Sequence, residues 1–284
     1  MDVAGRCSPR LAREQTGGVI ASRPSVNRPV PDAARGVVGA ASTTVVWENE
    51  VGGLTFEVID ATGRRFLKWF PAGCDIDPHA EIDRLRWAAQ FVTVPRVLAE
   101  GGDSSGAWVL TAALSGENAV TDRWRSDPAT AVRAIGRGLR DLHERLPVGD
   151  CPFSWSTESR LADITQRAAA GHLDPARWQE EHRGLGLDEA LRRAFDAPTP
   201  DMLVVCHGDA CAPNTLIADD GTCCGHVDLG SLGIADRWAD LAVATWSTQW
   251  NYRTGWERTL LDAYGVAPDV ERLAYYRLLW DLGP

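Results

Sequence analysis

The hydrophobic positions of this chain change their period near residue 115. Before that point, apolar and polar side chains alternate in short runs separated by glycine turns, which is typical of strands. Five strands are predicted, at residues 44–48, 54–60, 65–70, 95–99 and 107–113. One helix is predicted at residues 79–90, because Ile82, Leu85 and Ala89 share a face. The first part of the chain is therefore predicted to be a strand-rich lobe with a single helix.

Beyond residue 115, apolar side chains recur every three or four positions, which is the period of an amphipathic helix. The pattern is clearest over residues 132–146. Further helices are predicted at residues 161–170, 187–195, 238–249, 256–264 and 270–280. A short strand at 203–206 and a hairpin over 215–227, which turns at Gly221, come between them. The second part of the chain is therefore predicted to be mainly helical.

Three regions follow from this change of pattern. Residues 1–40 are rich in Gly, Ala, Pro, Ser and Arg without a sustained period, so we expect a flexible N-terminal tail with one short helix near 31–36. Residues 41–115 are expected to form the strand-rich N-terminal lobe, and residues 116–284 the helical C-terminal lobe. The predicted fold class is α+β, with an antiparallel sheet lobe followed by a mainly helical lobe.

The bulk composition excludes some classes of partner. The net charge is −10 and the isoelectric point is about 5.1, whereas a domain that binds nucleic acid carries a basic face. No apolar run approaches the roughly 20 residues that span a bilayer. Residues 1–40 lack the apolar segment of a secretory signal, and an odd number of cysteines, seven, fits reduced thiols. We therefore expect a cytoplasmic monomer or homodimer that binds neither nucleic acid nor membrane.

Candidate chemistry is concentrated in one segment of the helical lobe. It reads His207-Gly208-Asp209, then Asn214, then Asp228-Leu229-Gly230. Phosphoryl transfer from a nucleotide uses polar groups in this order: one aspartate deprotonates the attacking hydroxyl, and an asparagine and a second aspartate hold Mg²⁺. If the hairpin is symmetric about Gly221, residue 214 faces residue 228 with Cβ atoms about 4.5–5.5 Å apart. The segment predicts Asp209 as catalytic base and Asn214 and Asp228 as Mg²⁺ ligands.

The chain has one lysine among its 29 basic residues, Lys68, and it stands in the apolar run 66–70. A lysine in an apolar strand loses hydration unless it is paired, and Glu81 in the next helix is the natural partner. Kinases use such a pair to direct the lysine at the nucleotide phosphates. The alternative is a lysine that snorkels to the surface. The other predicted nucleotide contacts lie near this strand or at the lobe junction, at Gly52, Gly53, Thr55 and Ala113.

A zinc site is an alternative in the same segment. The candidate ligands are Cys206, His207, Cys211, Cys223, Cys224 and His226. Their spacings are not usual for zinc ligands, and alternation along a strand sends Cys223 and Cys224 to opposite faces. Zinc is therefore less favoured than Mg²⁺. A plain polar hairpin, whose Asp and Asn side chains only cap turns, is a further alternative.

Several longer stretches point to one protein family. They are Leu142-His143, Cys151-Pro152-Phe153, Glu180-Glu181-His182, residues 205–214, residues 232–242 and residues 274–279. With these stretches the chain resembles the aminoglycoside 3'-phosphotransferases, the kanamycin and neomycin kinases, in detail from Leu139 onward and more loosely before it. The resemblance implies a two-lobed protein-kinase-like fold, ATP or GTP as phosphoryl donor, Mg²⁺, and the roles given above for Asp209, Asn214, Asp228, Lys68 and Glu81. It also implies that Asp240 supports the catalytic loop.

The acceptor site departs from the pattern that this resemblance implies. Members of the family line the site with acidic groups, and Glu180 keeps one of these positions. Where further acids are expected, the chain carries Trp246, Trp250 and Trp280. The predicted substrate contacts are Glu180, Glu181, Trp246, Trp250 and Asp281, in an aromatic and less anionic pocket. Alternatively, the tryptophans are core residues of a repacked helical lobe.

Together these features predict an ATP-dependent O-phosphotransferase that acts on a hydroxyl of an aminoglycoside-like molecule, as a resistance kinase does. Residues 41–115 would then bind the nucleotide, and residues 116–284 would carry catalysis and the acceptor. The substrate would be small and hydroxylated, and a negative cleft would attract it if it were cationic. Two alternatives stay open. One is a kinase of another sugar-like metabolite or antibiotic, and the other is a nucleotide-binding module without catalysis.

Overall fold

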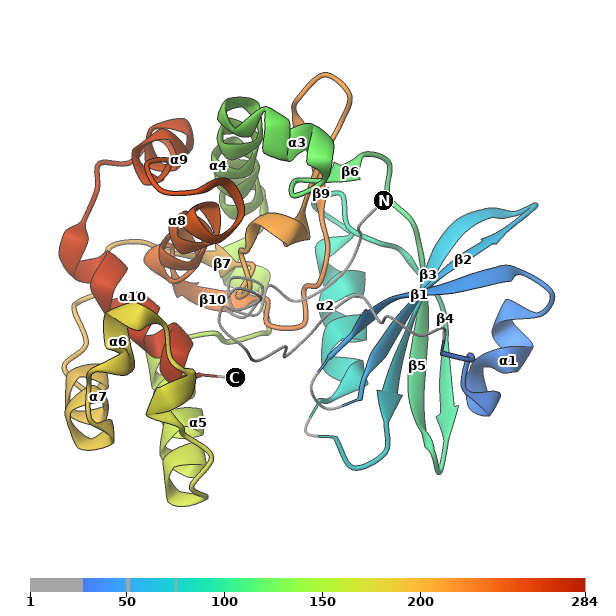
Figure 1. The fold of residues 1–284 in the computed structure, drawn as a ribbon, viewed down its shortest axis with the longest axis horizontal. Helices are drawn as coiled ribbons and strands as arrows, with labels where there is room; N and C mark the ends of the chain where they lie inside the picture. The colour runs from blue at the N-terminus through green and yellow to red at the C-terminus, as the bar shows by residue number, and fades with distance from the viewer. Residues whose placement is uncertain (1–27, 50–51, 75, 284) are drawn as a thin grey trace.

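The chain folds into two lobes, one built on a sheet and the other on helices (Figure 1). The computed structural model describes residues 28–49, 52–74 and 76–283. The predicted α+β fold, with the sheet lobe first, is confirmed. No helix in this described part is long and apolar enough to cross a membrane.

The N-terminal lobe is a five-stranded antiparallel sheet in the order β1-β2-β3-β5-β4. Its strands are β1 (Ser42–Glu48), β2 (Leu54–Asp60), β3 (Gly63–Pro71), β4 (Val97–Asp103) and β5 (Gly106–Ala112). Helix α2 (Pro78–Ala88) joins β3 to β4 and lies between the sheet and the C-terminal lobe (Figure 1). It begins with a proline, and Asp77 caps it by accepting the His79 N–H at 2.9 Å. The central strand β3 therefore carries Lys68 beside α2.

The flexible tail expected over residues 1–40 falls mostly outside the described residues, which begin at residue 28. The described part of that region is packed. It forms helix α1 (Asp32–Val38), whose Ala34 and Val38 are buried against Val45 and Phe56 of the sheet. The Trp108 indole N–H also donates to the Ala33 carbonyl at 2.9 Å. Two buried apolar side chains in a seven-residue helix are too few to reveal a clear sequence period.

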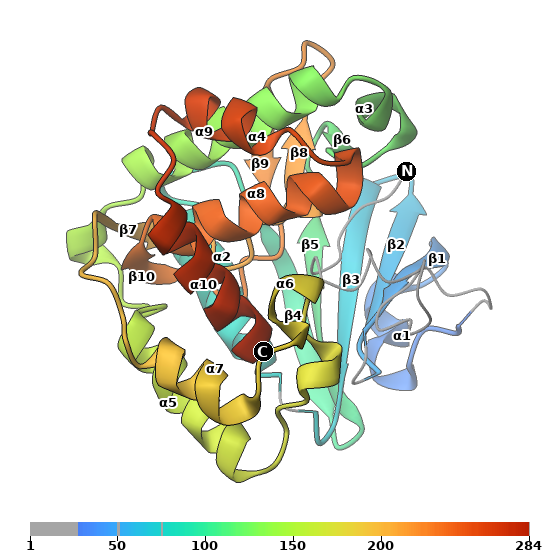
Figure 2. The ribbon, with the colours of Figure 1, turned by 60° about the vertical axis from the view of Figure 1, so that its left-hand side comes forward.

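The C-terminal lobe is a helical assembly with two small sheets. Its helices are α3 (Asp122–Ser126), α4 (Pro128–Arg145), α5 (Thr157–Ala169), α6 (Glu180–Arg183), α7 (Leu187–Ala194), α8 (Trp238–Tyr252), α9 (Glu257–Tyr264) and α10 (Val270–Leu282). One sheet pairs β7 (Leu203–Cys206) with β10 (Gly233–Asp236), and the other joins β6 (Glu117–Asn118), β8 (Thr215–Ile217) and β9 (Cys223–His226). In Figure 2, α8 and α10 lie side by side, and α6 lies next to α10.

Helix α4 runs through the core of this lobe. It begins at Pro128, with Asp127 accepting the Thr130 N–H at 3.2 Å. Its apolar stripe, which includes Ile135, Leu139 and Leu142, is almost fully buried. The predicted helix at 132–146 is thus present and starts one turn earlier, because a capped N-terminus extends it beyond its apolar stripe.

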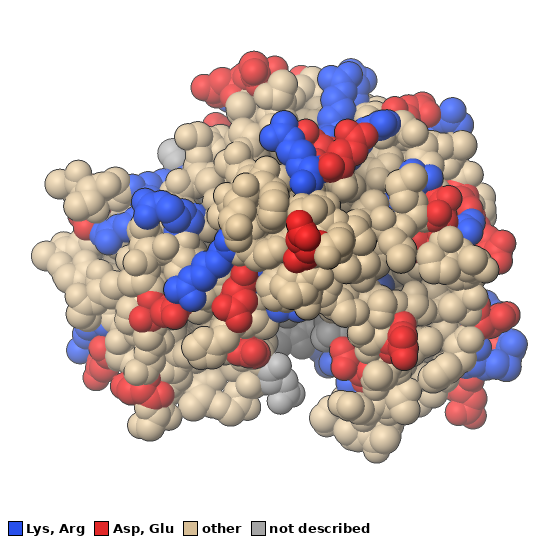
Figure 3. Space-filling view, turned by 180° about the vertical axis from the view of Figure 1, so that it is seen from behind, with Lys and Arg blue, Asp and Glu red and all other residues tan. Residues whose placement is uncertain are grey.

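The surface of the back of the molecule carries acidic and basic side chains interspersed over both lobes (Figure 3). No single sign of charge covers this face, although the sequence as a whole is acidic.

Candidate active site

The loop that carries Asp209, residues 207–214, is held by a buried carboxylate on α8. Asp240 accepts the His207 N–H at 2.6 Å and the Gly208 N–H at 2.9 Å, and the Nε2 of His143 lies 2.9 Å from the same group. Burial alone would raise the pKa of Asp240, but the hydrogen bond from His143 and the nearby imidazoles outweigh it, so the pKa is lowered. The ionised carboxylate therefore fixes the backbone just before Asp209.

Two further features shape this loop. Gly208 has φ +82°, and a Cβ at this position would lie 2.2 Å from the Ser231 carbonyl oxygen, so only glycine fits. At the other end of the loop, the Ser247 hydroxyl of α8 accepts the Ala212 N–H at 2.9 Å. Helix α8 thus supports the loop at both ends.

His207 adds a contact from inside the loop. Its Nε2 lies 3.0 Å from the Val227 carbonyl, and its Nδ1 lies 3.3 Å from the Asp209 amide nitrogen. A carbonyl only accepts and an amide N–H only donates, so His207 must be neutral with its proton on Nε2. Burial and the neighbouring His226 lower the pKa of His207 to about 4, in agreement with this tautomer. The neutral ring joins the Asp209 loop to the hairpin that precedes Asp228.

The predicted facing pair of the hairpin is wrong by one residue. We expected residue 214 to face residue 228, but Thr215 pairs with His226 and the Val227 N–H donates to the Asn214 carbonyl at 3.0 Å. The hairpin turns one residue earlier than expected, because Ile217 pairs with Cys223, and a bulge between Leu216 and Ile217 recovers only part of the difference. Asp228 follows directly and has φ +63°, a left-handed conformation that is uncommon outside glycine. This backbone turn brings the Asp228 carboxylate back to the site.

Asn214 has a buried side-chain oxygen that is available to a ligand. Its Nδ2 donates to the Asp209 carbonyl at 2.9 Å, which fixes the orientation of the amide. The Oδ1 is buried, and no donor among the described residues reaches it. A buried amide oxygen without a donor is costly unless a ligand occupies it. Together with the carboxylate of Asp228, it gives the oxygen-only donor set that Mg²⁺ prefers, so the residues present fit this ion.

Lys68 joins the two lobes at this site. Its Nζ lies 2.5 Å from the Glu81 carboxylate on α2 and 3.0 Å from the Asp228 carboxylate. Burial would lower the pKa of Lys68, but the charges of Asp228 and Glu81 outweigh it, so the pKa is raised. Lys68 is therefore a partly buried, ion-paired cation rather than a snorkelling surface residue, and the predicted pair with Glu81 is formed.

The predicted nucleotide contacts in the sheet lie around Lys68. Thr55 of β2 is paired in register with Lys68 and is buried. Gly52 has φ +79°, and the Gly53 N–H donates to the Asn49 side chain at 2.6 Å, so that side chain closes the turn between β1 and β2. Ala113 donates its own N–H to the Arg64 carbonyl at 3.1 Å. The Gly53 and Ala113 N–H groups are thus already hydrogen-bonded within the lobe. The contacts of Gly52, Gly53, Thr55 and Ala113 with a nucleotide stay predictions.

An apolar cluster between the lobes was missed from the sequence. It joins Val46 and Phe66 of the sheet to Leu216 and Val227 of the hairpin, and Ala113 packs against it. The cluster lies between the strand that carries Lys68 and the hairpin that precedes Asp228. Its sequence signal is weak, because each residue is a single apolar position in a different strand.

The predicted substrate residues lie on α6, α8 and α10. Glu180 and Glu181 are exposed at the start of α6. The Asp281 carboxylate holds this segment to α10, because it accepts the Gln179 N–H at 3.1 Å and lies 2.6 Å from the His182 Nδ1. Asp281 thus fixes the backbone on both sides of the two glutamates.

The predicted tryptophans differ in exposure. Trp246 is buried, with its ring 5.6 Å from His182 and 5.5 Å from Trp250. This burial fits the alternative of a core residue for Trp246. Trp250 and Trp280 are partly buried and pack against Cys211, two residues after Asp209, and Val243. These two indoles therefore border the catalytic loop.

The cysteines and histidines of the alternative zinc site do not converge. Cys206 donates to the Asp236 carbonyl, Cys211 packs against Val243, and Cys223 faces His226. Burial raises the pKa of Cys223 to about 11, so the thiolate that zinc requires is disfavoured. Within the described part of the chain, the metal-like group that does form is His143, Cys206 and Asp240, whose Asp240 carboxylate already supports the catalytic loop.

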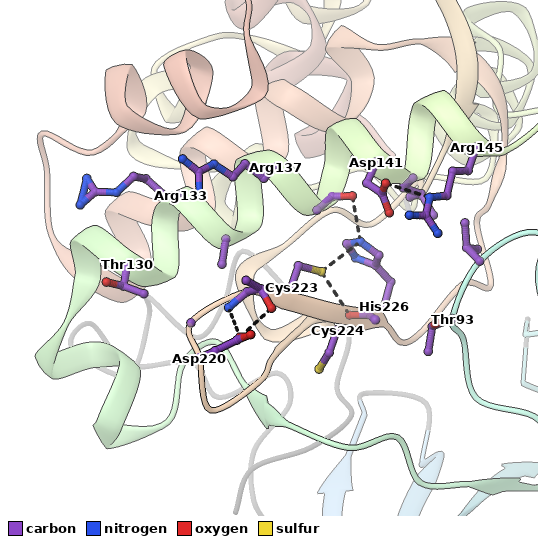
Figure 4. Close-up of a pocket in the computed structure, with 17 residues that line it drawn as sticks. Thr93, Thr130, Arg133, Arg137, Asp141, Arg145, Asp220, Cys223, Cys224 and His226 are labelled. Atoms are coloured by element: carbon purple, nitrogen blue, oxygen red, sulfur yellow. Dashed lines mark hydrogen bonds and ion pairs between the residues drawn. The ribbon is translucent and has the colours of Figure 1, made fainter.

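A separate cavity of about 720 Å³ lies between α4 and the β8–β9 hairpin (Figure 4). Charged side chains of both signs line it, including Arg137 and Asp141. His226 points from β9 towards α4, with its Nε2 3.3 Å from the Gly138 carbonyl and 3.7 Å from the Cys223 sulfur. Neither Lys68 nor Asp209 lines the cavity, so it is separate from the candidate active site.

Comparison with known proteins agrees with this geometry. Residues 48–276 match the model of the phosphotransferase enzyme family. An aminoglycoside 3'-phosphotransferase of Streptomyces fradiae is 36% identical over 220 residues, covering 74% of this chain and 81% of the relative. A streptomycin 3''-kinase of Streptomyces griseus is 36% identical over 247 residues, covering 81% and 88%.

Solved structures give the same result. The aminoglycoside phosphotransferase APH(3'')-Id of Streptomyces rimosus superposes with a TM-score of 0.74 and 30% identity, covering 88% of this chain and 96% of that one. An aminoglycoside 3'-phosphotransferase of type VIII superposes with a TM-score of 0.75 and 29% identity, covering 88% and 98%. The Streptomyces rimosus enzyme has also been solved with ADP and streptomycin, and that structure superposes with a TM-score of 0.67.

Proposed function

This chain belongs to the phosphotransferase enzyme family and is a kinase, and from that premise we propose that it moves the γ-phosphoryl group of ATP to a hydroxyl of an aminoglycoside-like antibiotic. The observation that supports this most directly is the convergence of Lys68, Glu81 and Asp228 in one ion-paired group next to the Asp209 loop. These are the parts that phosphoryl transfer requires. Aminoglycoside and streptomycin kinases among the relatives support the class of acceptor.

The reaction uses the chain's own groups in defined roles. Asp209 accepts a hydrogen bond from the acceptor hydroxyl, orients its oxygen towards the γ-phosphorus and receives its proton. A new O–P bond forms as the bond between the γ-phosphorus and the β,γ-bridging oxygen breaks, and ADP leaves. Lys68, held by Glu81, contacts the nucleotide phosphates. Asn214 and Asp228 would hold Mg²⁺, which would supply charge neutralisation on the phosphate oxygens.

We expect the base of the nucleotide to lie beside the apolar cluster between the lobes. Val46 and Phe66 from the sheet and Leu216 and Val227 from the hairpin face one another between the lobes. A purine ring is flat and mostly apolar on its faces, so it suits such a surface. Ala113, at the edge of the cluster, stands at the start of the connection to the C-terminal lobe, where backbone groups can recognise the edge of the ring.

The acceptor would lie between the catalytic loop and the wall formed by α6, α8 and α10. Glu180 and Glu181 offer carboxylates to amino or guanidino groups, and Asp281 holds the segment that carries them. Trp250 and Trp280 offer indole faces next to the catalytic loop, and aromatic faces bind both sugar rings and cations. Trp246 supports Trp250 from within the core.

Internal pairing reduces the negative charge of this wall. The Glu257 carboxylate accepts a hydrogen bond from the Arg277 guanidinium at 2.6 Å. The same guanidinium lies 3.8 Å from the Glu181 carboxylate and over the Trp246 ring. We therefore expect tighter binding of acceptors with one or two cationic groups than of those with many. A kinase of a different hydroxylated sugar-like molecule remains the second candidate, and the aromatic wall is the observation that favours it.

An acceptor screen tests the proposal. Purified protein with Mg²⁺ and ATP would be given streptomycin, kanamycin, neomycin and neutral glycosides, and ADP release and a mass increase of the acceptor by one phosphate would be measured. Phosphorylation of at least one aminoglycoside is the expected result. Turnover of neutral glycosides alone would favour the second candidate, and nucleotide binding without any phosphorylated product would contradict a kinase function.

A further inference from the structure

Helix α2 contacts the C-terminal lobe through a side chain that has no role in the site described so far. Arg84 stands one turn after Glu81 on the same helix. Its Nε donates to the Leu232 carbonyl at 2.7 Å, and its Nη1 donates to the Ala80 carbonyl at 2.9 Å. Leu232 follows Asp228 by four residues, so Arg84 binds the same loop that carries the predicted metal ligand.

An aromatic ring completes the environment of this arginine. The guanidinium carbon of Arg84 lies 4.8 Å from the centre of the Phe153 ring, and Trp87, one turn further along α2, meets that ring edge-on with centroids 6.0 Å apart. Burial lowers the pKa of Arg84 from its usual value, although the group stays a cation at neutral pH. The arginine is therefore enclosed between a carbonyl and an aromatic face.

The loop that Arg84 binds leads directly into a segment that is hydrogen-bonded to residues 153–155. The Ile234 N–H donates to the Phe153 carbonyl at 2.9 Å, and the Trp155 N–H donates to the Ile234 carbonyl at 3.0 Å. A Cβ on Gly233 would lie 2.6 Å from the backbone of Ser154, so the two segments touch closely. Arg84 thus connects α2 to a fixed part of the C-terminal lobe rather than to a mobile segment.

Two kinds of contact hold α2 against that lobe. Leu85 and Ala88 are buried in its apolar core. Apolar contacts are non-directional, so they leave the rotation of the helix about its axis loosely fixed. The hydrogen bond from Arg84 to the Leu232 carbonyl is directional, and it fixes the rotation at which Glu81 points towards Lys68, while the bond to the Ala80 carbonyl holds the arginine against its own helix. A change of that rotation would move the Glu81 carboxylate out of reach of the amine.

We propose that Arg84 is a positioning residue that locks α2 to the loop after Asp228 and thereby keeps Glu81 in register with Lys68. This inference rests on the proposed function, because it assigns Lys68 to the nucleotide phosphates. The orientation of α2 that allows Glu81 to contact Lys68 would then depend on a permanent contact within the chain. The Lys68–Glu81 pair would then be assembled without a separate activating event.

A double-mutant cycle between Arg84 and Glu81 tests this. Arg84→Met keeps an unbranched side chain and removes the donors together with the cation over Phe153, and Glu81→Gln removes the charge that holds Lys68. The affinity for Mg·ATP would be measured by calorimetry on the full chain, with turnover measured alongside. We expect each single change to weaken nucleotide binding by about tenfold and to lower turnover by about 10- to 100-fold, because small misplacements of reacting groups have effects of this size.

The decisive readout is additivity. If Arg84 acts through Glu81, the double variant binds nucleotide no more weakly than the weaker single variant. Losses that multiply, or an Arg84→Met variant with wild-type affinity and turnover, would overturn the inference. If Arg84→Met does not fold, Arg84→Lys, which keeps the charge and one donor, takes its place with the same two outcomes.

Arg86 provides the matched control. It lies on the same helix, is exposed, and pairs with Glu100 at the surface at 2.9 Å. Arg86→Met should leave nucleotide affinity and turnover unchanged, because surface ion pairs contribute little. Nucleotide affinity needs no acceptor, so the cycle gives its result whether or not the proposed antibiotic acceptor is correct.

Discussion

Lys68 and Asp228 are 160 positions apart in the sequence, yet their Nζ and Oδ1 atoms lie 3.0 Å apart. The pair joins the central strand of the sheet lobe to the loop after β9 in the helical lobe. Glu81 contacts the same amine from α2 at 2.5 Å. The ion-paired group around Lys68 is thus built from three separate segments. The position of the Lys68 amine, which is proposed to bind the nucleotide phosphates, depends on the contact between the lobes.

Removing this cation should abolish most of the activity. In Lys68→Met, the Glu81 and Asp228 carboxylates lose the cation between them. The nucleotide phosphates lose the cation that would contact them. We expect turnover to fall by about two to three orders of magnitude, as for other preorganised charges in active sites. Steady-state kinetics and nucleotide titration would measure the effect. A Lys68→Met variant that retained wild-type nucleotide affinity would argue against the assignment.

Asp240 should matter for both stability and activity. In Asp240→Asn, an amide N–H₂ would replace one of the oxygens that accept the His207 and Gly208 N–H groups, and a buried donor would face another donor. We expect a loss of roughly 3 kcal/mol in the free energy of unfolding, as for other broken buried pairs, and a fall in turnover. Urea denaturation would measure the first effect.

Asp262→Asn serves as the control for Asp240→Asn. Asp262 pairs with Arg258 at the surface of α9 at 2.8 Å. The same chemical change there should alter the free energy of unfolding by less than about 0.5 kcal/mol. Equal losses in the two variants would show that Asp240 has no special role.

The neutral state of His207 predicts a pH dependence of stability. The folded pKa of His207 is about 4, whereas the usual value is 6.5. Between these two values the unfolded chain binds more protons than the folded chain, so stability is present in full above pH 6.5 and is lost as pH falls towards 4. The shift corresponds to roughly 3 kcal/mol. Unfolding free energies measured at several pH values in this window would show the slope.

The variant His207→Gln separates the titration of this histidine from that of the other titratable groups of the chain. A glutamine keeps a donor towards the Val227 carbonyl and an acceptor towards the Asp209 N–H, but it does not titrate. The variant should lose less stability than the wild type between pH 6.5 and 4. Parallel slopes for the two proteins would contradict the neutral, buried assignment of His207.

The indoles next to the catalytic loop should act on the acceptor alone. Trp250→Ala removes an aromatic face beside Cys211, so the KM of the acceptor should rise by about tenfold, in keeping with the 1–2 kcal/mol of a good aromatic contact. The KM of ATP should stay unchanged. Trp108→Phe, in the sheet lobe, is the control. An equal rise in both KM values for Trp250→Ala would point to a general structural effect.

Much of the fold could be predicted because its elements are long and strongly patterned. Residues 203–206 form a strand with the predicted bounds, and the five strands of the sheet lobe were found within a few residues. Short elements were missed. Strand β10 (Gly233–Asp236) and helix α6 (Glu180–Arg183) span four residues each, which is too short for either pattern to repeat enough times to be recognised.

The site was predictable in its residue types but not in its geometry. The order of Asp209, Asn214 and Asp228 carries the chemical signal, and the lone Lys68 adds to it. The expected register was wrong because Ile217 pairs with Cys223, so the hairpin turns one residue before Gly221, and a bulge between Leu216 and Ile217 then shifts the pairs again. Both depend on local backbone shape that the side-chain pattern does not encode. The contact of His182 with Asp281 joins residues 99 positions apart and has no local signal.

The most direct test of the central claim compares Asp209→Asn with the wild-type chain. Both proteins would be given Mg²⁺, ATP and the acceptor found in the screen, and the phosphorylated product and nucleotide affinity would be measured. We predict that Asp209→Asn loses turnover by several orders of magnitude while its nucleotide affinity stays within a few-fold of the wild type, because this carboxylate acts on the acceptor hydroxyl. Wild-type turnover in Asp209→Asn would contradict the account.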